Sequence, residues 1–225
     1  MTEEVLSEFV GFDVNGGVAV LELRRPEKRN AVSWDMWEAI LAHLAVASGR
    51  PEIGVLVVKG SGGAFCAGAD LGEVKRSDGT ASASFHELVV RSLCAIAEFP
   101  VPSVASIEGA CIGGGCSIAL ACDIRFAHSN AFFAIPAVRH GIVYDRGSIG
   151  RLVELLGSGR AAHMLFTAQR LDAAQAARIG LVDECSSELD ELVTNFTDAV
   201  LRGDASTMVA TRKLIRNAAQ RTAGL

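Results

Sequence analysis

Two stretches of the chain share one design, and this design constrains the fold more than any other feature of the sequence. Each begins with a run typical of a strand, continues through small residues and then starts a helix: VVKGSGGAFCAGADLGEV and SIEGACIGGGCSIALAC. Repeated strand, loop and helix units are typical of α/β proteins. The sequence therefore predicts the α/β class.

The segments on either side extend this pattern. The runs FVGFDV and VAVLEL flank an Asn-Gly turn, which is a strong hairpin signal. SWDMWEAILAHLAVA has helical spacing with Ser33 in the N-cap position, and Pro100 stops a later helix, FHELVVRSLCAIAEF. From residue 187 the chain is helical and polar in pattern. We expect a core domain over residues 1–186 and a C-terminal helical region over residues 187–225.

Composition and charge exclude several classes of protein. The chain has 225 residues, 50% of them hydrophobic, which suits one compact domain. Its formal net charge of −5 argues against a nucleic-acid groove, which needs clustered Lys and Arg. The acidic N-terminus lacks a signal-peptide pattern, and the longest near-apolar run, Ala110 to Cys122, is too short for a bilayer. We expect no membrane segment and a cytoplasmic location.

The six cysteines do not predict a metal site. None forms a C-x-x-C pair, and no histidine lies at zinc-ligand spacing. Most lie in apolar runs, where cysteine usually behaves as a small buried hydrophobic residue. The sequence therefore predicts reduced core cysteines and no metal ligands.

The loops of the two opening stretches also offer backbone groups to a ligand. Small residues allow close approach, and N–H groups at a helix start carry partial positive charge. Two such groups aimed at one oxygen form an oxyanion hole, in which each donor typically contributes roughly 3–4 kcal/mol. Taken singly, each glycine turn is better explained as a packing device. Neither loop matches a phosphate-binding pattern, because G-x-x-x-x-G-K-[ST] is absent and no G-x-G-x-x-G follows a strand.

Four motifs, read in order, resemble those of the crotonase family, the enoyl-CoA hydratase/isomerase superfamily. They are LELRRPEKRNAVSWDMWEAI, AFCAGADLGEV, IEGACIGGGCSIALACDIRFA and LDAAQAARIGLVDE, and the match runs from about Val18 to about Arg216. The resemblance implies a spiral of ββα units with a helical C-terminal part that binds an acyl-CoA. It is specific for the fold and much less specific for the reaction, because this fold hosts many reactions.

The resemblance also implies a binding site. In the family two backbone N–H groups hold the thioester carbonyl, and by motif they fall on Ala67 and Gly114. The basic loop around Arg25, Lys28 and Arg29 would face the CoA phosphates, with solvated surface charge as the alternative. Coenzyme A enters as part of the substrate, so no separate cofactor is implied, and the family usually forms homo-oligomers, either trimers or hexamers. The implied substrate-binding residues are Arg25, Lys28, Arg29, Ala67, Gly68, Ala69, Asp70, Gly113, Gly114, Ser117 and Ala137.

The sequence departs from the family's hydratases at two acidic positions. The hydratases carry two glutamates that manage the water, and these positions are Ser117 and Ala137 here. A serine can bond a water, but it cannot act as a strong base near pH 7. The chain also ends soon after TRKLIRNAAQ, whereas family members typically continue for several more helical turns.

The loop GIVYDRG supplies the remaining carboxylate. Dienoyl-CoA isomerases, which the surrounding residues resemble, place an aspartate at the position of Asp145 as an acid/base. Tyr144 can donate a hydrogen bond to a polar group of the substrate. Alternatively, Asp145 is the N-cap of the following helix, and Arg146 pairs with it or with Glu154. His140 is the reserve acid/base.

The leading interpretation is an enzyme of the enoyl-CoA hydratase/isomerase type, a lyase or isomerase of fatty acid metabolism. It would stabilise a thioester enolate through Ala67 and Gly114 and move a proton with Asp145. Two alternatives stay open: an acyl-CoA decarboxylase or hydrolase using the same site, and a non-catalytic CoA-binding subunit.

Overall fold

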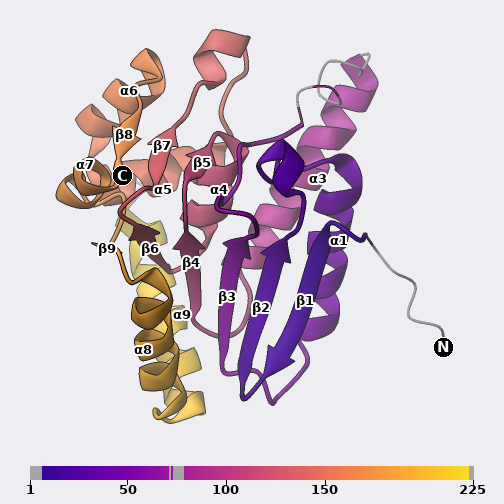
Figure 1. The fold of residues 1–225 in the computed structure, drawn as a ribbon, viewed down its shortest axis with the longest axis vertical. Coiled ribbons are helices and arrows are strands. Elements are labelled where there is room, and N and C mark those ends of the chain that lie inside the picture. Colours follow the sequence, from indigo (N-terminus) through magenta and orange to yellow (C-terminus); the bar gives the residue numbers. More distant parts are fainter. Residues whose placement is uncertain (1–6, 71, 73–78, 223–225) are drawn as a thin grey trace.

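The computed structural model describes residues 7–70, 72 and 79–222, and their strands form two sheets (Figure 1). Within the described residues the larger sheet has six strands in the order β1-β2-β3-β4-β6-β9, and the smaller has three in the order β5-β7-β8. The larger sheet comprises β1 (Val10–Asn15), β2 (Val18–Leu23), β3 (Val55–Gly60), β4 (Ser103–Ile107), β6 (Ile124–His128) and β9 (Glu184–Ser186). The smaller sheet comprises β5 (Ala110–Ile112), β7 (Phe132–Ala134) and β8 (Leu171–Asp172).

The larger sheet begins with a hairpin and continues in parallel pairs. β1 and β2 pair antiparallel, with Val10 opposite Leu23, and both glycines of the turn between them have positive φ. The pairs β2–β3, β3–β4, β4–β6 and β6–β9 are all parallel. Parallel neighbours need a crossover, and the helices α1 (Trp34–Ala47), α3 (Gly79–Ala97) and α4 (Gly114–Ala121) lie in these connections. The predicted α/β class and the hairpin are confirmed.

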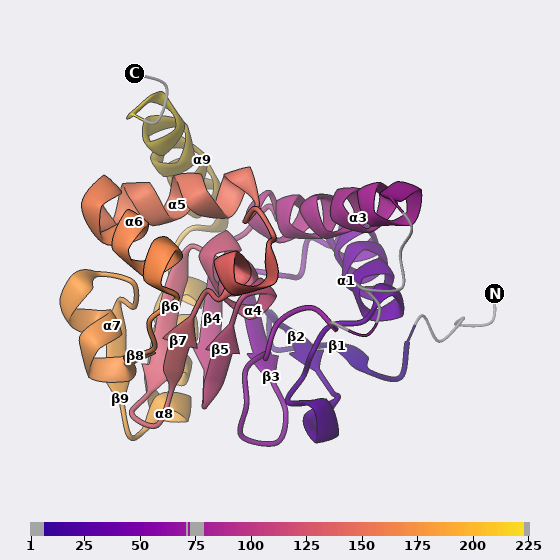
Figure 2. The ribbon, with the colours of Figure 1, turned by 90° about the horizontal axis from the view of Figure 1, so that it is seen from above.

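The two faces of the larger sheet are buried by different helices. Side chains alternate between the faces, so Leu56 and Val58 join the main hydrophobic core while Val57 joins a second, smaller cluster. Residues of α8 (Leu189–Leu201), among them Leu189 and Phe196, pack in that second cluster. Figure 2 shows α8 on the opposite side of the sheet from α1 and α3.

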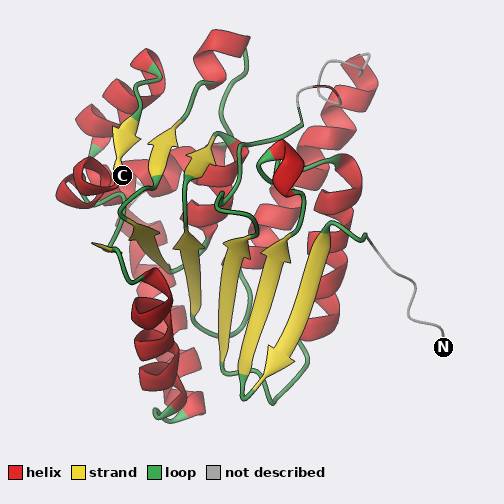
Figure 3. Cartoon of the chain, viewed as in Figure 1, coloured by secondary structure: helices red, strands yellow, loops and turns green. Residues whose placement is uncertain are grey.

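Of the remaining helices, one short helix follows β2 and the others lie after β7 (Figure 3). Among the described helices, none is both long and apolar enough to cross a membrane. These remaining elements are η1 (Pro26–Lys28), η2 (Ala137–His140), α5 (Arg146–Leu156), α6 (Ser158–Thr167), α7 (Ala173–Ile179) and α9 (Ala205–Thr222).

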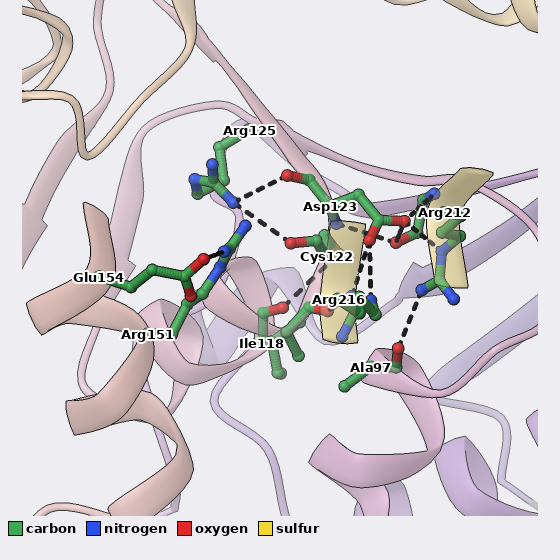
Figure 4. A network of polar contacts seen from close by, with 11 residues as sticks. Ala97, Ile118, Cys122, Asp123, Arg125, Arg151, Glu154, Arg212 and Arg216 are labelled. Atoms are coloured by element: carbon green, nitrogen blue, oxygen red, sulfur yellow. Dashed lines mark hydrogen bonds and ion pairs between the residues drawn. The ribbon is translucent and has the colours of Figure 1, made fainter. Parts of the chain in front are cut away.

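Ion pairs fasten α9 to the core (Figure 4). Arg212 Nε lies 2.6 Å from Asp123 Oδ2, and Arg216 Nη2 lies 2.8 Å from Asp123 Oδ1. The two guanidinium groups also donate to the carbonyl oxygens of Ala97 and Ala121. The C-terminal helical segment is therefore packed on the core through Asp123, which lies two residues after the end of α4.

Four of the six cysteines are buried, as the apolar runs predicted, and Cys94 is exposed. Burial raises the pKa of the Cys66 and Cys122 thiols to about 12, so these groups stay protonated near neutral pH. Buried, protonated thiols are poor nucleophiles and poor metal ligands.

Candidate active site

The two glycine-rich loops meet at the carboxyl ends of β3 and β5. Cys66 pairs with Cys111 through backbone hydrogen bonds, from Cys66 N to Ala110 O at 2.8 Å and from Ile112 N to Cys66 O at 2.9 Å. A Cβ added at Gly115 would lie 2.3 Å from Cys66 O, so this position has room only for glycine. The close approach brings the first loop alongside the start of α4.

Ala69, rather than Ala67, presents the free N–H group of the first loop. The Ala67 N–H donates to Arg29 O at 2.9 Å, so it is not available to a ligand. Ala69 forms a parallel bridge with Val32, in which Val32 N donates to Gly68 O and Asp70 N donates to Val32 O. The Ala69 N–H makes no hydrogen bond within the described part of the chain. The prediction that Ala67 offers the free N–H of this loop is therefore wrong, and Ala69 offers it instead.

Gly114 presents the second free N–H group. It is the first residue of α4, and its N-cap residue Gly113 has φ 51°. A first-turn N–H has no acceptor inside its own helix, and among the residues that the structure describes Gly114 N has no other partner. A Cβ added at Gly114 would lie 3.2 Å from Ala69 N, so the two free N–H groups are close neighbours. The positive end of the helix dipole adds to the attraction for an anionic oxygen.

The carboxyl group of Asp145 does two things at once. Its Oδ1 accepts from Ser148 N at 2.8 Å, which makes Asp145 the N-cap of α5. Its Oδ2 lies 3.0 Å from Ser117 Oγ, in the first turns of α4. The helix-cap alternative is therefore observed at Oδ1, while Oδ2 lies beside Ser117 and makes no capping contact. Arg146 is exposed and has no ion pair within the described residues, so the alternative that it pairs with Asp145 or Glu154 is wrong; Glu154 pairs with Arg151 instead.

Tyr144 is directed into the protein instead of toward a ligand. Its hydroxyl donates to Gly113 O at 2.8 Å and accepts from Ser117 Oγ at 2.7 Å. Burial raises the pKa of the Tyr144 phenol well above its usual range, so the hydroxyl keeps its proton. The predicted hydrogen bond from Tyr144 to the substrate would require this bond to Gly113 to break.

A proton count shows what the chain of contacts can hold. Three oxygen–oxygen contacts connect Asp145 to Ser117, Ser117 to Tyr144 and Tyr144 to the Gly113 carbonyl, and each needs one proton. The two hydroxyls supply two protons and the carbonyl supplies none. The third fits on Asp145 Oδ2, which then donates to Ser117. The Ser117 hydroxyl can therefore act as donor or as acceptor toward Asp145 Oδ2.

Of the three cations Arg25, Lys28 and Arg29 in the basic loop, Arg25 is anchored and the other two form no ion pair in the described part of the chain. Arg25 Nη1 lies 2.8 Å from Asp70 Oδ2 and 3.2 Å from Ala31 O. The hydrogen bond from Arg25 lowers the pKa of Asp70 and keeps this carboxylate charged. Lys28 and Arg29 are exposed, and in the described part of the chain neither forms an ion pair. Arg25 thus anchors the first loop, and only Lys28 and Arg29 keep a free charge for a phosphate.

The second replaced acidic position, Ala137, begins η2 and packs against the main core. Arg139 anchors η2, because its Nη2 donates to the carbonyls of Thr167 and Ala168 at 3.2 Å each. His140 is exposed. Neither Ala137 nor its neighbours restore the missing carboxylate, so Asp145 is the only carboxylate that the structure places beside Ser117 among the described residues.

The motif-based assignment did not include Asn30, whose side-chain amide forms hydrogen bonds to the backbone of two loops at the site. Asn30 is fully buried with φ 57°, and its side-chain nitrogen donates to Ser61 O at 2.9 Å and to Ala64 O at 2.7 Å. Its side-chain oxygen accepts from Arg25 N at 2.8 Å. Asn30 thus joins the basic loop to the first glycine-rich loop. The sequence signal that could have identified Asn30 is an asparagine between a basic loop and a helix N-cap, because asparagine tolerates positive φ better than most residues.

Comparisons with known proteins agree with this geometry. The model of the family described as enoyl-CoA hydratase/isomerase matches residues 13–222. Enoyl-CoA hydratase domain-containing protein 2, mitochondrial, of Mus musculus is 34% identical over 178 residues, which cover 79% of this chain and 60% of that protein. The peroxisomal Delta(3,5)-Delta(2,4)-dienoyl-CoA isomerase of Arabidopsis thaliana is 32% identical over 208 residues, covering 86% and 75%. The chain thus spans only part of the length of these relatives.

A solved structure confirms the predicted crotonase fold. An enoyl-CoA hydratase/isomerase family protein from Hyphomonas neptunium superposes with a TM-score of 0.90 at 31% identity, covering 96% of this chain and 84% of that one. The family match and the superposed structure confirm the resemblance predicted from the four motifs. The chain belongs to the enoyl-CoA hydratase/isomerase family.

Proposed function

We propose that the chain catalyses a proton shift along the acyl chain of an enoyl-CoA thioester, which moves the carbon–carbon double bond. The observation that carries the proposal is the position of Asp145 Oδ2, 3.0 Å from Ser117 Oγ. Ser117 lies in the same short helix, α4, whose first residue Gly114 offers a free N–H. One acid/base and one oxyanion-binding pair are what a proton shift next to a thioester requires.

The two N–H groups make the substrate acidic enough to react. Removal of a proton from the acyl chain of a thioester places negative charge on the carbonyl oxygen. Donors from Ala69 and Gly114 stabilise this enolate oxygen without any change in protonation of the protein, and each typically contributes roughly 3–4 kcal/mol. Both donors are backbone groups held by neighbouring segments, so they need no reorganisation when the charge develops.

Asp145 carries the proton between two carbons. As a carboxylate it takes a proton from one carbon of the acyl chain, and the bonding electrons move to the thioester oxygen as the enolate forms. As a carboxylic acid it returns a proton to a different carbon, and the double bond settles in its new place. No water is consumed. The contacts of Ser117 and Tyr144 accommodate the proton in the interval.

The same residues disfavour hydration. A two-carboxylate hydratase uses one group to activate water and another to protonate carbon, and Ser117 and Ala137 replace that pair here. A serine hydroxyl does not act as a base near pH 7. In the binding of coenzyme A, we propose that Lys28 and Arg29 face its phosphates, whereas Arg25 anchors Asp70.

The test is to incubate the purified protein with 3-enoyl-CoA and 3,5-dienoyl-CoA substrates in D₂O and to identify products by mass spectrometry and ultraviolet absorption. We expect isomers that carry solvent deuterium, and a loss of at least roughly 10²-fold in turnover for Asp145→Asn. A hydrated acyl-CoA as the main product contradicts the proposal, as does unchanged turnover in Asp145→Asn. Thioester binding without turnover instead favours a non-catalytic CoA-binding subunit.

A further inference from the structure

We infer that Tyr144 is a positioning residue that strengthens the Gly114 oxyanion donor from behind. Its hydroxyl donates to the Gly113 carbonyl at 2.8 Å, and that carbonyl belongs to the same peptide group as the Gly114 N–H. The inference rests on the proposed function, because it concerns how well Gly114 stabilises an enolate. It assigns Tyr144 no contact with the substrate.

The physical link is the peptide bond between Gly113 and Gly114. Resonance couples the carbonyl oxygen to the amide nitrogen, so a hydrogen bond to the oxygen draws electron density away from the N–H. The N–H becomes a stronger donor, and such cooperative strengthening amounts to perhaps 10–30% per bond. Gly113 O accepts two donors, Tyr144 Oη and the helical Ser117 N–H at 3.1 Å. Only the first comes from a side chain.

The other oxyanion donor has the same arrangement. The Ala69 N–H shares its peptide group with the Gly68 carbonyl, and Gly68 O accepts from Val32 N at 2.8 Å. Both donor peptides therefore have a hydrogen bond on the carbonyl side. On the Ala69 side the donor is the backbone N–H of Val32. On the Gly114 side the donor is the Tyr144 hydroxyl, which a single substitution removes.

The Tyr144 hydroxyl is suited to this role. Burial raises its pKa, so the proton that reaches Gly113 is present throughout the neutral range. Ser117 Oγ lies 2.7 Å behind it, and when its proton is donated to the phenol oxygen rather than to Asp145 Oδ2 it strengthens the phenol as a donor in turn. The ring packs against the main core, which holds the hydroxyl in place.

The effect can be read directly from the carbonyl of a bound thioester. The probe is crotonyl-CoA with a ¹³C label at the thioester carbonyl, and the measurement is its infrared stretching frequency in the complex. In the wild-type protein we expect a lower frequency than in water. In Tyr144→Phe, which removes only the hydroxyl, we expect a smaller shift and a turnover about two- to eightfold lower. A purely structural role for Tyr144 would lower turnover or stability without a graded change in this frequency.

The sequence offers a second, gentler perturbation, because Tyr144 is the only tyrosine in the chain. Biosynthetic replacement of tyrosine by 3-fluorotyrosine therefore changes this one hydroxyl and makes it a stronger donor. We expect a larger carbonyl shift than in the wild-type protein. This arm does not depend on whether Tyr144→Phe folds.

The outcomes separate the inference from the proposed function. A shifted carbonyl in the wild-type complex that is unchanged in both altered proteins overturns the inference and leaves the oxyanion hole intact. An unshifted carbonyl in the wild-type complex overturns both. A shift that increases from Tyr144→Phe to wild type to the fluorinated protein supports both.

Discussion

Two aspartates stand at opposite ends of the same short helix, and their surroundings differ. Asp123 follows α4, and its carboxyl group accepts from Arg212, from Arg216 and from both the N–H and the hydroxyl of Ser103 (Figure 4). Asp145 lies near the start of α4; its Oδ1 accepts from Ser148 N, and its Oδ2 lies 3.0 Å from Ser117 Oγ. Among the described residues it has no cationic partner.

The difference separates an anchor from a group that can exchange a proton. Burial alone would raise the pKa of Asp123, but the charges of Arg216 and Arg212 outweigh it and hold the pKa below its usual value. A carboxylate held in this way stays ionised and fixes α9 to the core. The second oxygen of Asp145 faces the hydroxyl of Ser117, which can act either as donor or as acceptor toward it.

The largest expected effect separates the two roles of Asp145. Asp145→Asn keeps an oxygen that can accept from Ser148 N, and asparagine caps helices as well as aspartate. It removes the acid/base, which typically contributes 10²- to 10⁴-fold. We expect turnover to fall by about that factor while the melting temperature stays within about 2 °C. Asp145→Ala is the matched control, because it should lose the cap as well, at about 1 kcal/mol. Equal loss of stability in both variants would contradict the division between the two oxygens.

The complementary substitution at Asp123 should affect stability and leave the chemistry unchanged. Asp123→Asn removes the negative charge between Arg212 and Arg216 and leaves two partly buried guanidinium groups uncompensated. We expect the free energy of unfolding in urea to fall by about 3 kcal/mol. Turnover per folded molecule should stay within about twofold. A large loss of turnover in a fully folded Asp123→Asn protein would show that α9 contributes to the site.

The pH dependence of stability should reveal the same anchor. The pKa of Asp123 is lowered by folding, so its contribution is fully present above the unfolded-state value, about 3.9, and is lost as the pH falls through the lower folded value. The difference in unfolding free energy between wild type and Asp123→Asn should therefore be constant from pH 7 to about pH 5. It should shrink as the pH falls below about 4. A difference that grows on acidification would contradict the assignment of Asp123 as an ionised anchor.

Much of the fold could be predicted from local signals. Asn-Gly placed the first hairpin, Ser33 caps α1 through Met36 N, and the β-branched runs became buried parallel strands. These features depend on a few neighbouring residues, so pattern alone identifies them. The anchoring of α9 was not predictable, because Asp123 and Arg216 are 93 positions apart and nothing local marks either as a partner.

The loops and most residues of the site could be predicted from the sequence, but the hydrogen bonds between them could not. The sequence located both loops, Ser117 and Asp145, but it assigned the donor to Ala67. In a regular strand, residues two apart direct their N–H groups to the same side. Gly68 has φ 109°, which breaks this regularity between Ala67 and Ala69. The bond from Tyr144 to Gly113 was likewise unpredictable, because it depends on how two distant loops pack.

The smallest effects should come from a matched pair of serines, one beside each aspartate. Ser103 Oγ and Ser117 Oγ each lie 3.0 Å from the Oδ2 atom of their aspartate, and both serines are buried. Each serine-to-alanine change should lower the unfolding free energy by about 1 kcal/mol, the usual value of one hydrogen bond. Turnover should distinguish the two variants. Ser103→Ala leaves both arginines on Asp123 and should not change turnover. Ser117→Ala removes the hydroxyl that contacts Asp145 Oδ2 and should lower turnover about tenfold. Equal turnover in the two variants would mean that the hydroxyl beside Asp145 is as structural as the one beside Asp123.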